Sequence, residues 1–212
     1  MKLQDRLKRT LLLAVIGFAI GGAVGGWSLL QSTNTENQDD GGGHEIVSAK
    51  IGGTFSLVDQ DGVARTEKDY AGKYKLIYFG FTYCPAICPT ELSKMAEAYL
   101  SLPSDIQQNI QPIFISVDPD RDTPAVMKGY VGLFMPQLVG LTGTPAQVEA
   151  VKKDFKVYAV KVPEGSGSDE YTVDHSSMMY YLTPDGQTVA MFKTGDSVEK
   201  IAERIKGSLQ LE

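Results

Sequence analysis

The chain has 212 residues and a mass of 23.0 kDa, which allows one ordinary domain with appendages and excludes a multidomain assembly. It carries 20 Lys and Arg against 26 Asp and Glu, and beyond residue 9 the balance is 16 to 25, so it lacks the excess positive charge typical of a nucleic-acid-binding protein. Only two Cys and two His are present, which excludes a disulfide-dense scaffold or a zinc-finger array.

The N-terminus predicts a membrane anchor. Residues 1–10 are basic, and residues 11–30 contain no charged side chain. As a helix this run would be about 30 Å long, enough to cross a hydrocarbon core, and it exceeds the usual apolar stretch of a cleavable signal peptide. The positive-inside rule keeps residues 1–10 cytoplasmic and exports the rest. The lack of an Arg/Ser-rich transit peptide favours a bacterial inner membrane protein, single-pass, with its C-terminal domain in the periplasm or outside.

Polar and Gly-rich residues follow the apolar run, so residues 31–50 are expected to form a flexible linker and residues 51–212 the folded domain. Within the domain, β-branched and aromatic runs predict strands, and Thr-Pro or Ser caps predict helices. In chain order, the expected elements are strand Lys75–Tyr83, helix Thr90–Leu102, strand Pro112–Val117, a helix from Pro124, strand Leu138–Leu141, helix Pro145–Phe155, strands Met178–Leu182 and Thr188–Lys193, and a helix from Ser197 to Lys206.

This alternation of strands and helices, closed by a hairpin and a helix, predicts an α/β three-layer domain. Both cysteines lie where the first buried strand gives way to a helix. A thiol at a helix N-terminus faces unpaired N–H groups and the positive end of the helix dipole, which favours the thiolate. The spacing from Cys84 to Cys88, with Pro85 and Pro89 stiffening the turn, allows both sulfurs to lie on one side.

Two thiolates close a disulfide or bind a soft metal, of which Cu(I) prefers sulfur and commonly takes an imidazole as a further ligand. His175 is the one histidine in the expected domain. It stands 87 residues after Cys88, so only the fold brings the two together. A Gly- and Ser-rich loop from Pro163 to Tyr171 precedes this histidine and is expected to be mobile.

Three segments together resemble the Sco/SenC family of membrane-anchored copper-binding proteins that assemble cytochrome c oxidase. The segment Tyr83-Cys84-Pro85 through Cys88-Pro89-Thr90 is similar to the copper motif of the family. Asp118-Pro119-Asp120-Arg121-Asp122-Thr123-Pro124 resembles its second hallmark, with Asp120 where Glu is common. Asp174-His175-Ser176-Ser177 resembles the third, and the similarity extends from about Gly53 to Ile205.

The resemblance implies a thioredoxin-like fold and a copper ion bound by the thiolates of Cys84 and Cys88 and a nitrogen of His175. It implies a metallochaperone, not an enzyme, that delivers copper to the Cu(A) centre on oxidase subunit II. Other copper chaperones and thioredoxin-like reductants are further expected partners.

Several neighbouring residues are further candidates for a role at the site. The charges of residues 118–122 are expected to be mostly solvated, with Asp122 or Thr123 capping a helix, although Asp118 is a candidate site residue because it follows a strand. Asp174 could orient His175. Phe81, Tyr83 and Phe134 could shield the metal, but aromatic residues beside a strand more often belong to the core.

Three other functions remain open. The first is a thiol–disulfide oxidoreductase that uses Cys84 and Cys88 to reduce the cysteines of the apo Cu(A) site or of another exported partner. Its activity should survive the loss of His175, whereas copper binding should weaken. The second is a peroxide-reducing or redox-sensing protein with one reactive cysteine. The third is a structural disulfide in an anchored domain.

Overall fold

The computed structural model describes residues 51–165 and 170–209. The predicted basic N-terminus, anchor and linker lie outside the described residues, as do residues 166–169 at the centre of the Gly/Ser-rich loop. No helix within the described ranges combines the length and apolar character needed to cross a membrane. The anchor over residues 11–30 therefore stays a prediction.

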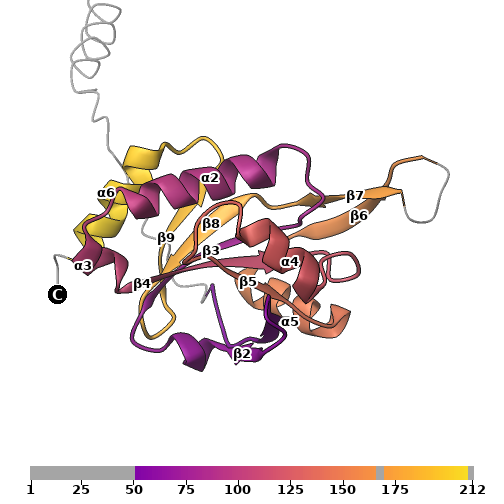
Figure 1. Cartoon of the computed structure of the whole chain (residues 1–212), viewed down its shortest axis with the longest axis horizontal. Helices are drawn as coiled ribbons and strands as arrows, with labels where there is room; N and C mark the ends of the chain where they lie inside the picture. Colours follow the sequence, from indigo (N-terminus) through magenta and orange to yellow (C-terminus); the bar gives the residue numbers. More distant parts are fainter. Residues whose placement is uncertain (1–50, 166–169, 210–212) are drawn as a thin grey trace, which may run out of the picture. The chain divides into compact units, whose positions relative to one another are not determined.

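Strands and helices alternate along most of the described chain (Figure 1). In order they are β1 (Ser56–Asp59), β2 (Ala64–Thr66), the 3-10 helix η1 (Glu67–Tyr70), β3 (Tyr74–Gly80), α2 (Ile87–Leu100), α3 (Ser104–Gln107), β4 (Ile110–Ser116), α4 (Pro124–Val131), β5 (Val139–Thr142), α5 (Pro145–Phe155), β6 (Ala159–Pro163), β7 (Tyr171–His175), β8 (Met178–Leu182), β9 (Thr188–Lys193) and α6 (Val198–Leu209).

Seven of the strands form one mixed sheet in the order β2-β1-β5-β4-β3-β8-β9. β3, β4 and β5 are parallel, and the flanking strands β1 and β8 run antiparallel to their neighbours. β3 is buried along its whole length, as expected for a central strand covered on both faces. The remaining strands, β6 and β7, pair with each other in a separate two-stranded sheet.

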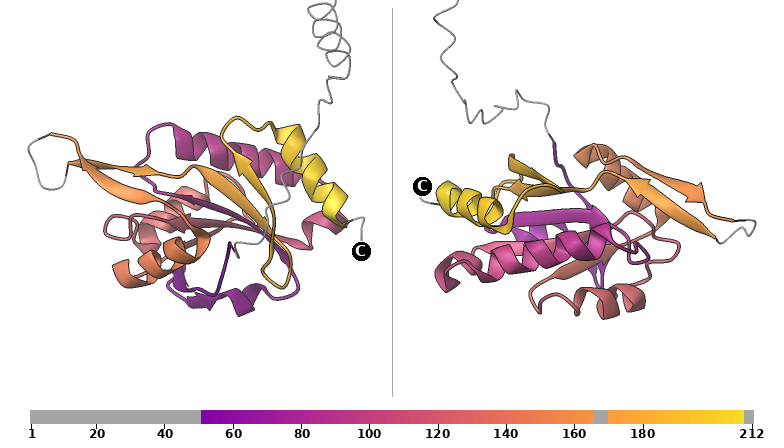
Figure 2. Two further views of the ribbon diagram at one scale, coloured as in Figure 1. Left: turned by 180° about the vertical axis from the view of Figure 1, so that it is seen from behind. Right: turned by 90° about the horizontal axis from the view of Figure 1, so that it is seen from above.

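Successive side chains of the central strands face opposite layers of helices. Tyr78 packs on Phe114 and donates a hydrogen bond toward Cys88 at the start of α2. The next residue, Phe79, instead contacts Phe155 of α5 on the other side. Together with the α2–α6 packing, this arrangement confirms the expected three-layer α/β domain (Figure 2).

The predicted caps explain several boundaries. Thr123 accepts a hydrogen bond from the Val126 N–H at the start of α4, and Thr144 forms a capping box with Gln147 at the start of α5. The hairpin strands β8 and β9 and the helix α5 have the bounds expected from the sequence.

Three elements differ from the expectation in ways that affect the candidate site. β3 ends at Gly80 and not at Tyr83, so residues 81–83 belong to the turn before the cysteines. Helix α2 starts at Ile87, three residues before Thr90, because proline is tolerated in a first helical turn, where Pro89 lies. Cys88 is therefore a helical residue. The hairpin of β6 and β7 was not foreseen, and His175 ends a strand instead of standing free before one.

Candidate metal centre

The two cysteines lie at the carboxyl end of β3, where α2 begins. Cys84 is half-buried in the turn after the strand, and Cys88 is fully buried in the first turn of α2. The Cys88 backbone N–H donates to the Cys84 sulfur over 3.4 Å. Because Ala86 at the N-cap position provides no side-chain acceptor, the sulfur of Cys84 takes that role at the positive end of the helix.

His175 approaches the pair from the end of β7. Its Nε2 lies 3.4 Å from the Cys88 sulfur, and its Nδ1 lies 3.2 Å from the carbonyl oxygen of Ser176. With the proton on Nδ1, the ring donates to that carbonyl, and the lone pair on Nε2 faces the sulfurs. One donor atom from each of Cys84, Cys88 and His175 lies within 4.8 Å of the other two.

The pKa values of the two thiols are shifted in opposite directions. Hydrogen bonding with the Cys88 side chain is the largest cause that lowers the pKa of Cys84 to about 3; the Cys88 N–H acts in the same direction, against a partial burial that raises it. Hydrogen bonding to Cys84 and burial both raise the pKa of Cys88. The accessible sulfur is therefore the thiolate, and the buried one carries the proton.

Aromatic residues enclose the inner side of the cluster. The hydroxyl of Tyr78 donates to the Cys88 sulfur over 3.7 Å, and the Phe81 ring meets the His175 ring edge-on at 5.6 Å between centroids. Gly80 lies directly against Cys88, since a Cβ at that position would stand 2.7 Å from the sulfur. The sequence reasoning missed Tyr78 and Gly80, although a glycine inside a bulky strand signals a close approach.

The other aromatic candidates do not enclose the cluster. Tyr83 is 61% exposed, and its ring lies over the Arg121 guanidinium at 4.8 Å. Phe134 packs on Tyr130 of α4 as part of the core. Of the three aromatic residues considered, Phe81 contacts the candidate ligands.

The expectation that residues 118–122 are mostly solvated is wrong for two of the carboxylates. Asp118 and Asp122 are both fully buried. Asp122 accepts hydrogen bonds from Thr82 and Ser116, while Thr123 is the cap of α4. These polar partners compensate for the removal of the carboxylates from water.

Asp174 does not orient His175. It is exposed, because adjacent side chains of a strand point to opposite faces, and the contact to the Nδ1 of His175 comes from the Ser176 carbonyl.

The donor set and its scaffold define a class of protein. Two sulfurs and one imidazole nitrogen, with no carboxylate among the three, suit a soft metal such as Cu(I) and also permit thiol exchange. The chain is therefore a thioredoxin-like α/β protein with a cysteine–histidine cluster at the end of its central strand.

Comparison with known proteins identifies the family. The SCO1/SenC family model matches residues 44–210, and the chain belongs to this family. It is 38% identical over 200 residues to the mitochondrial SCO2 homolog of Bos taurus, which covers 93% of this chain and 74% of that one. It is 38% identical over 210 residues to the SCO2-like protein of Rickettsia felis, covering 98% and 100%.

Comparison with solved structures gives the same family. Copper-bound ScoI of Bradyrhizobium japonicum superposes with a TM-score of 0.68 at 43% identity, over 74% of this chain and 98% of that one. BsSco, a member of the Sco family of cytochrome c oxidase assembly proteins described as having a disulfide switch, superposes with a TM-score of 0.60 at 27% identity, over 76% and 94%.

Proposed function

We propose that this protein is a copper metallochaperone that binds one copper ion through Cys84, Cys88 and His175 and helps assemble the Cu(A) centre on cytochrome c oxidase subunit II. The proposal is carried by the three donor atoms within 4.8 Å of one another. Copper-bound relatives of the same fold support it, as does the part that the Sco family plays in oxidase assembly. The protein then acts by binding and transfer of metal, not as an enzyme.

The chemistry of transfer follows from the ligands. Copper supplies a soft, thiophilic centre that exchanges readily among sulfur and imidazole donors. Cys84 is half-exposed and ionised, so it is the ligand accessible to an incoming donor, whereas Cys88 is enclosed by Tyr78 and the core. A further part of the proposal is that residues 11–30 anchor the domain in a bacterial inner membrane, with the copper domain on the outer side.

Copper titration tests this function. The reduced full-length protein is titrated with Cu(I) against a competing chelator, and thiolate-to-copper charge transfer is read after oxidation to Cu(II). We expect one tight copper per chain, weakened by more than about 100-fold in His175→Ala, because even the loss of a group that only supports a ligand costs 10- to 100-fold. Asp174→Ala, an exposed neighbour, is the matched control and should bind normally. Binding of His175→Ala with wild-type affinity would exclude the three-ligand site.

A second function, thiol–disulfide exchange, is favoured by the low pKa of Cys84 beside a buried second thiol. The Cys84 thiolate would attack a disulfide of the apo Cu(A) site, form a mixed disulfide and release one partner thiolate. Cys88, giving up its proton, would then attack the Cys84 sulfur, release the second partner thiol and leave a Cys84–Cys88 disulfide. A thioredoxin-like reductant would restore both thiols. Reduction of a disulfide peptide by His175→Ala at the wild-type rate would support this activity.

A further inference from the structure

His175 is carried by a hairpin that stands apart from the main sheet. β6 and β7 pair only with each other among the described strands and extend from the body of the domain (Figures 1 and 2). No ladder of backbone hydrogen bonds therefore fixes the hairpin to the main sheet. The position of His175 relative to the cysteines therefore depends on the two-residue link to β8 and on side-chain contacts.

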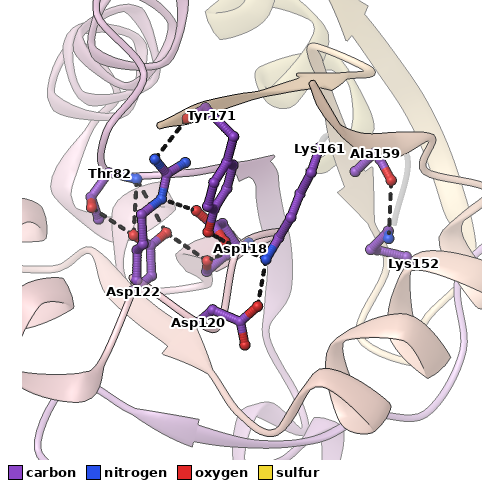
Figure 3. Close-up of polar contacts among 10 residues, drawn as sticks. Thr82, Asp118, Asp120, Asp122, Lys152, Ala159, Lys161 and Tyr171 are labelled. Atoms are coloured by element: carbon purple, nitrogen blue, oxygen red, sulfur yellow. Dashed lines mark hydrogen bonds and ion pairs between the residues drawn. The ribbon is translucent and has the colours of Figure 1, made fainter. Parts of the chain in front are cut away.

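The strongest of these contacts come from the loop between β4 and α4 (Figure 3). The Tyr171 hydroxyl of β7 donates to Asp118 Oδ1 over 2.8 Å, and Arg121 Nη1 donates to the Tyr171 carbonyl over 2.8 Å. Arg121 Nε donates to the other carboxylate oxygen of Asp118 over 2.5 Å. The guanidinium also lies 3.7 Å from the centroid of the Tyr171 ring. Three side chains thus form one closed cluster, Asp118–Arg121–Tyr171.

The two charged side chains of this cluster are shielded from water. Asp118 is fully buried and Arg121 is mostly buried, so neither group has water as an easy replacement for its partner. Lys161 of β6 also contacts this loop through ion pairs with Asp120 over 2.5 Å and with Asp118 over 3.8 Å. Its side chain is about half exposed, so these pairs are expected to contribute little.

The same loop also reaches the cysteines. Asp122 accepts hydrogen bonds from the backbone N–H and the hydroxyl of Thr82, two residues before Cys84. One short loop therefore contacts the cysteine turn through Asp122 and the histidine strand through Asp118 and Arg121. Tyr171 and His175 are four residues apart in β7 and point to the same face of the strand.

We propose that Asp118, Arg121 and Tyr171 are positioning residues that place His175 against the cysteine pair before copper arrives, and that they thereby set the copper affinity. This inference rests on the proposed copper site. None of the three is a ligand. Their effect is to remove the free-energy cost of ordering the hairpin when the metal binds, since a site that is only partly populated binds with proportionally lower affinity.

The inference is tested by removing the hydroxyl group of Tyr171. Tyr171→Phe removes the bond to Asp118 and keeps the ring under Arg121, so the fold is expected to survive. Tyr158→Phe removes an exposed hydroxyl beside the same hairpin and is the matched control. Arg121→Lys is a second variant, because an ammonium cannot donate in two fixed directions as the guanidinium does. Copper affinity is measured for the reduced full-length proteins, and hydrogen exchange of β6 and β7 amides is measured without metal.

We expect Tyr171→Phe to lower copper affinity about tenfold and to accelerate exchange in β6 and β7 but not in β3 or β4, with Tyr158→Phe unchanged. In the His175→Ala background, Tyr171→Phe should have no further effect on the residual affinity. Wild-type affinity in Tyr171→Phe, or losses that multiply in the double variant, would overturn the inference. If the wild-type protein itself binds no copper, the proposed function fails, and unchanged exchange in Tyr171→Phe would then separately show that the cluster does not order the hairpin.

Discussion

Gly80 is the residue on which the packing of the buried sulfur most directly depends. A Cβ there would lie 2.7 Å from the Cys88 sulfur and 3.1 Å from the rings of Phe114 and Tyr78. These neighbours belong to the core and have little room to shift. We therefore expect Gly80→Ala to destabilise the protein by about 1–3 kcal/mol, the usual cost of overpacking, and to weaken copper binding by displacing Cys88.

Chemical denaturation and copper titration measure both effects. Gly129→Ala, in α4 with open space around its Cβ position, is the control and should be neutral or stabilise by about 0.5–1 kcal/mol. A Gly80→Ala protein as stable as wild type would show that Cys88 has space to move.

The two thiols of the site differ in pKa and therefore in reactivity. Because the pKa of Cys84 is about 3, this thiol is ionised throughout the range from pH 5 to 8, whereas the raised pKa of Cys88 keeps it protonated there. We expect iodoacetamide to modify Cys84 at a rate that hardly changes across this range and to leave Cys88 unmodified in the folded protein. An ordinary thiol would react about tenfold faster for each pH unit below its pKa of about 8.5.

Mass spectrometry of the alkylated peptides gives the rates, with Cys84→Ser as the control that should remain unmodified. A rate for Cys84 that climbs steeply between pH 6 and 8 would contradict the assignment of the thiolate.

Among the elements, those defined by local signals could be predicted, and those defined by long-range contacts could not. The Thr144 cap and the Pro-Asp-Gly turn before β9 mark boundaries within a few residues, so α5 and the β8–β9 hairpin were correctly bounded. β6 pairs with β7 across a Gly/Ser-rich loop, and that pairing has no local signal. For the same reason the residues of the candidate site were found by motif, but the cluster that orders His175 was not.

The buried Asp122 links β3, β4 and α4. Its carboxylate accepts hydrogen bonds from Thr82 and Ser116, and its removal leaves buried donors without a partner. We expect Asp122→Ala to destabilise by about 3 kcal/mol, since each orphaned buried group costs about 1–3 kcal/mol. Asp122→Asn should cost less, because an amide still offers an oxygen to Thr82.

The pH dependence of this effect follows from the pKa of Asp122, which burial raises above its ordinary value. A raised carboxyl pKa means that the folded state binds the proton more tightly than the unfolded state, so this group lowers stability as the pH rises from the unfolded pKa of about 3.9 through the folded pKa. The unfolding free energy of wild type minus that of Asp122→Asn should therefore fall between pH 4 and pH 7. Denaturant titrations at both pH values measure it, and a difference that grows with pH would contradict the raised pKa.

At the scale of the whole molecule, a bound copper ion would join two parts of the chain 87 residues apart, the turn after β3 and the end of β7. Because the unfolded chain does not hold the three donors together, copper binding should stabilise the native state through linkage. With free copper a thousandfold above its Kd the gain is about 4 kcal/mol, which corresponds to a rise in Tm of about 10 °C for a domain of this size. Differential scanning calorimetry of the reduced protein with and without Cu(I) measures it.

Two comparisons separate a three-ligand site from copper bound by sulfur alone or by scattered surface groups. Protein oxidised to a Cys84–Cys88 disulfide has no free thiol or thiolate to bind copper, so its Tm should not respond to copper. His175→Ala retains both cysteine ligands but loses the link to the hairpin, so its Tm should rise by less than that of wild type. An equal rise in all three proteins would place the copper elsewhere. A rise in the two reduced proteins of the same size would show that the hairpin takes no part in binding, because the metal would then stabilise the cysteine turn alone.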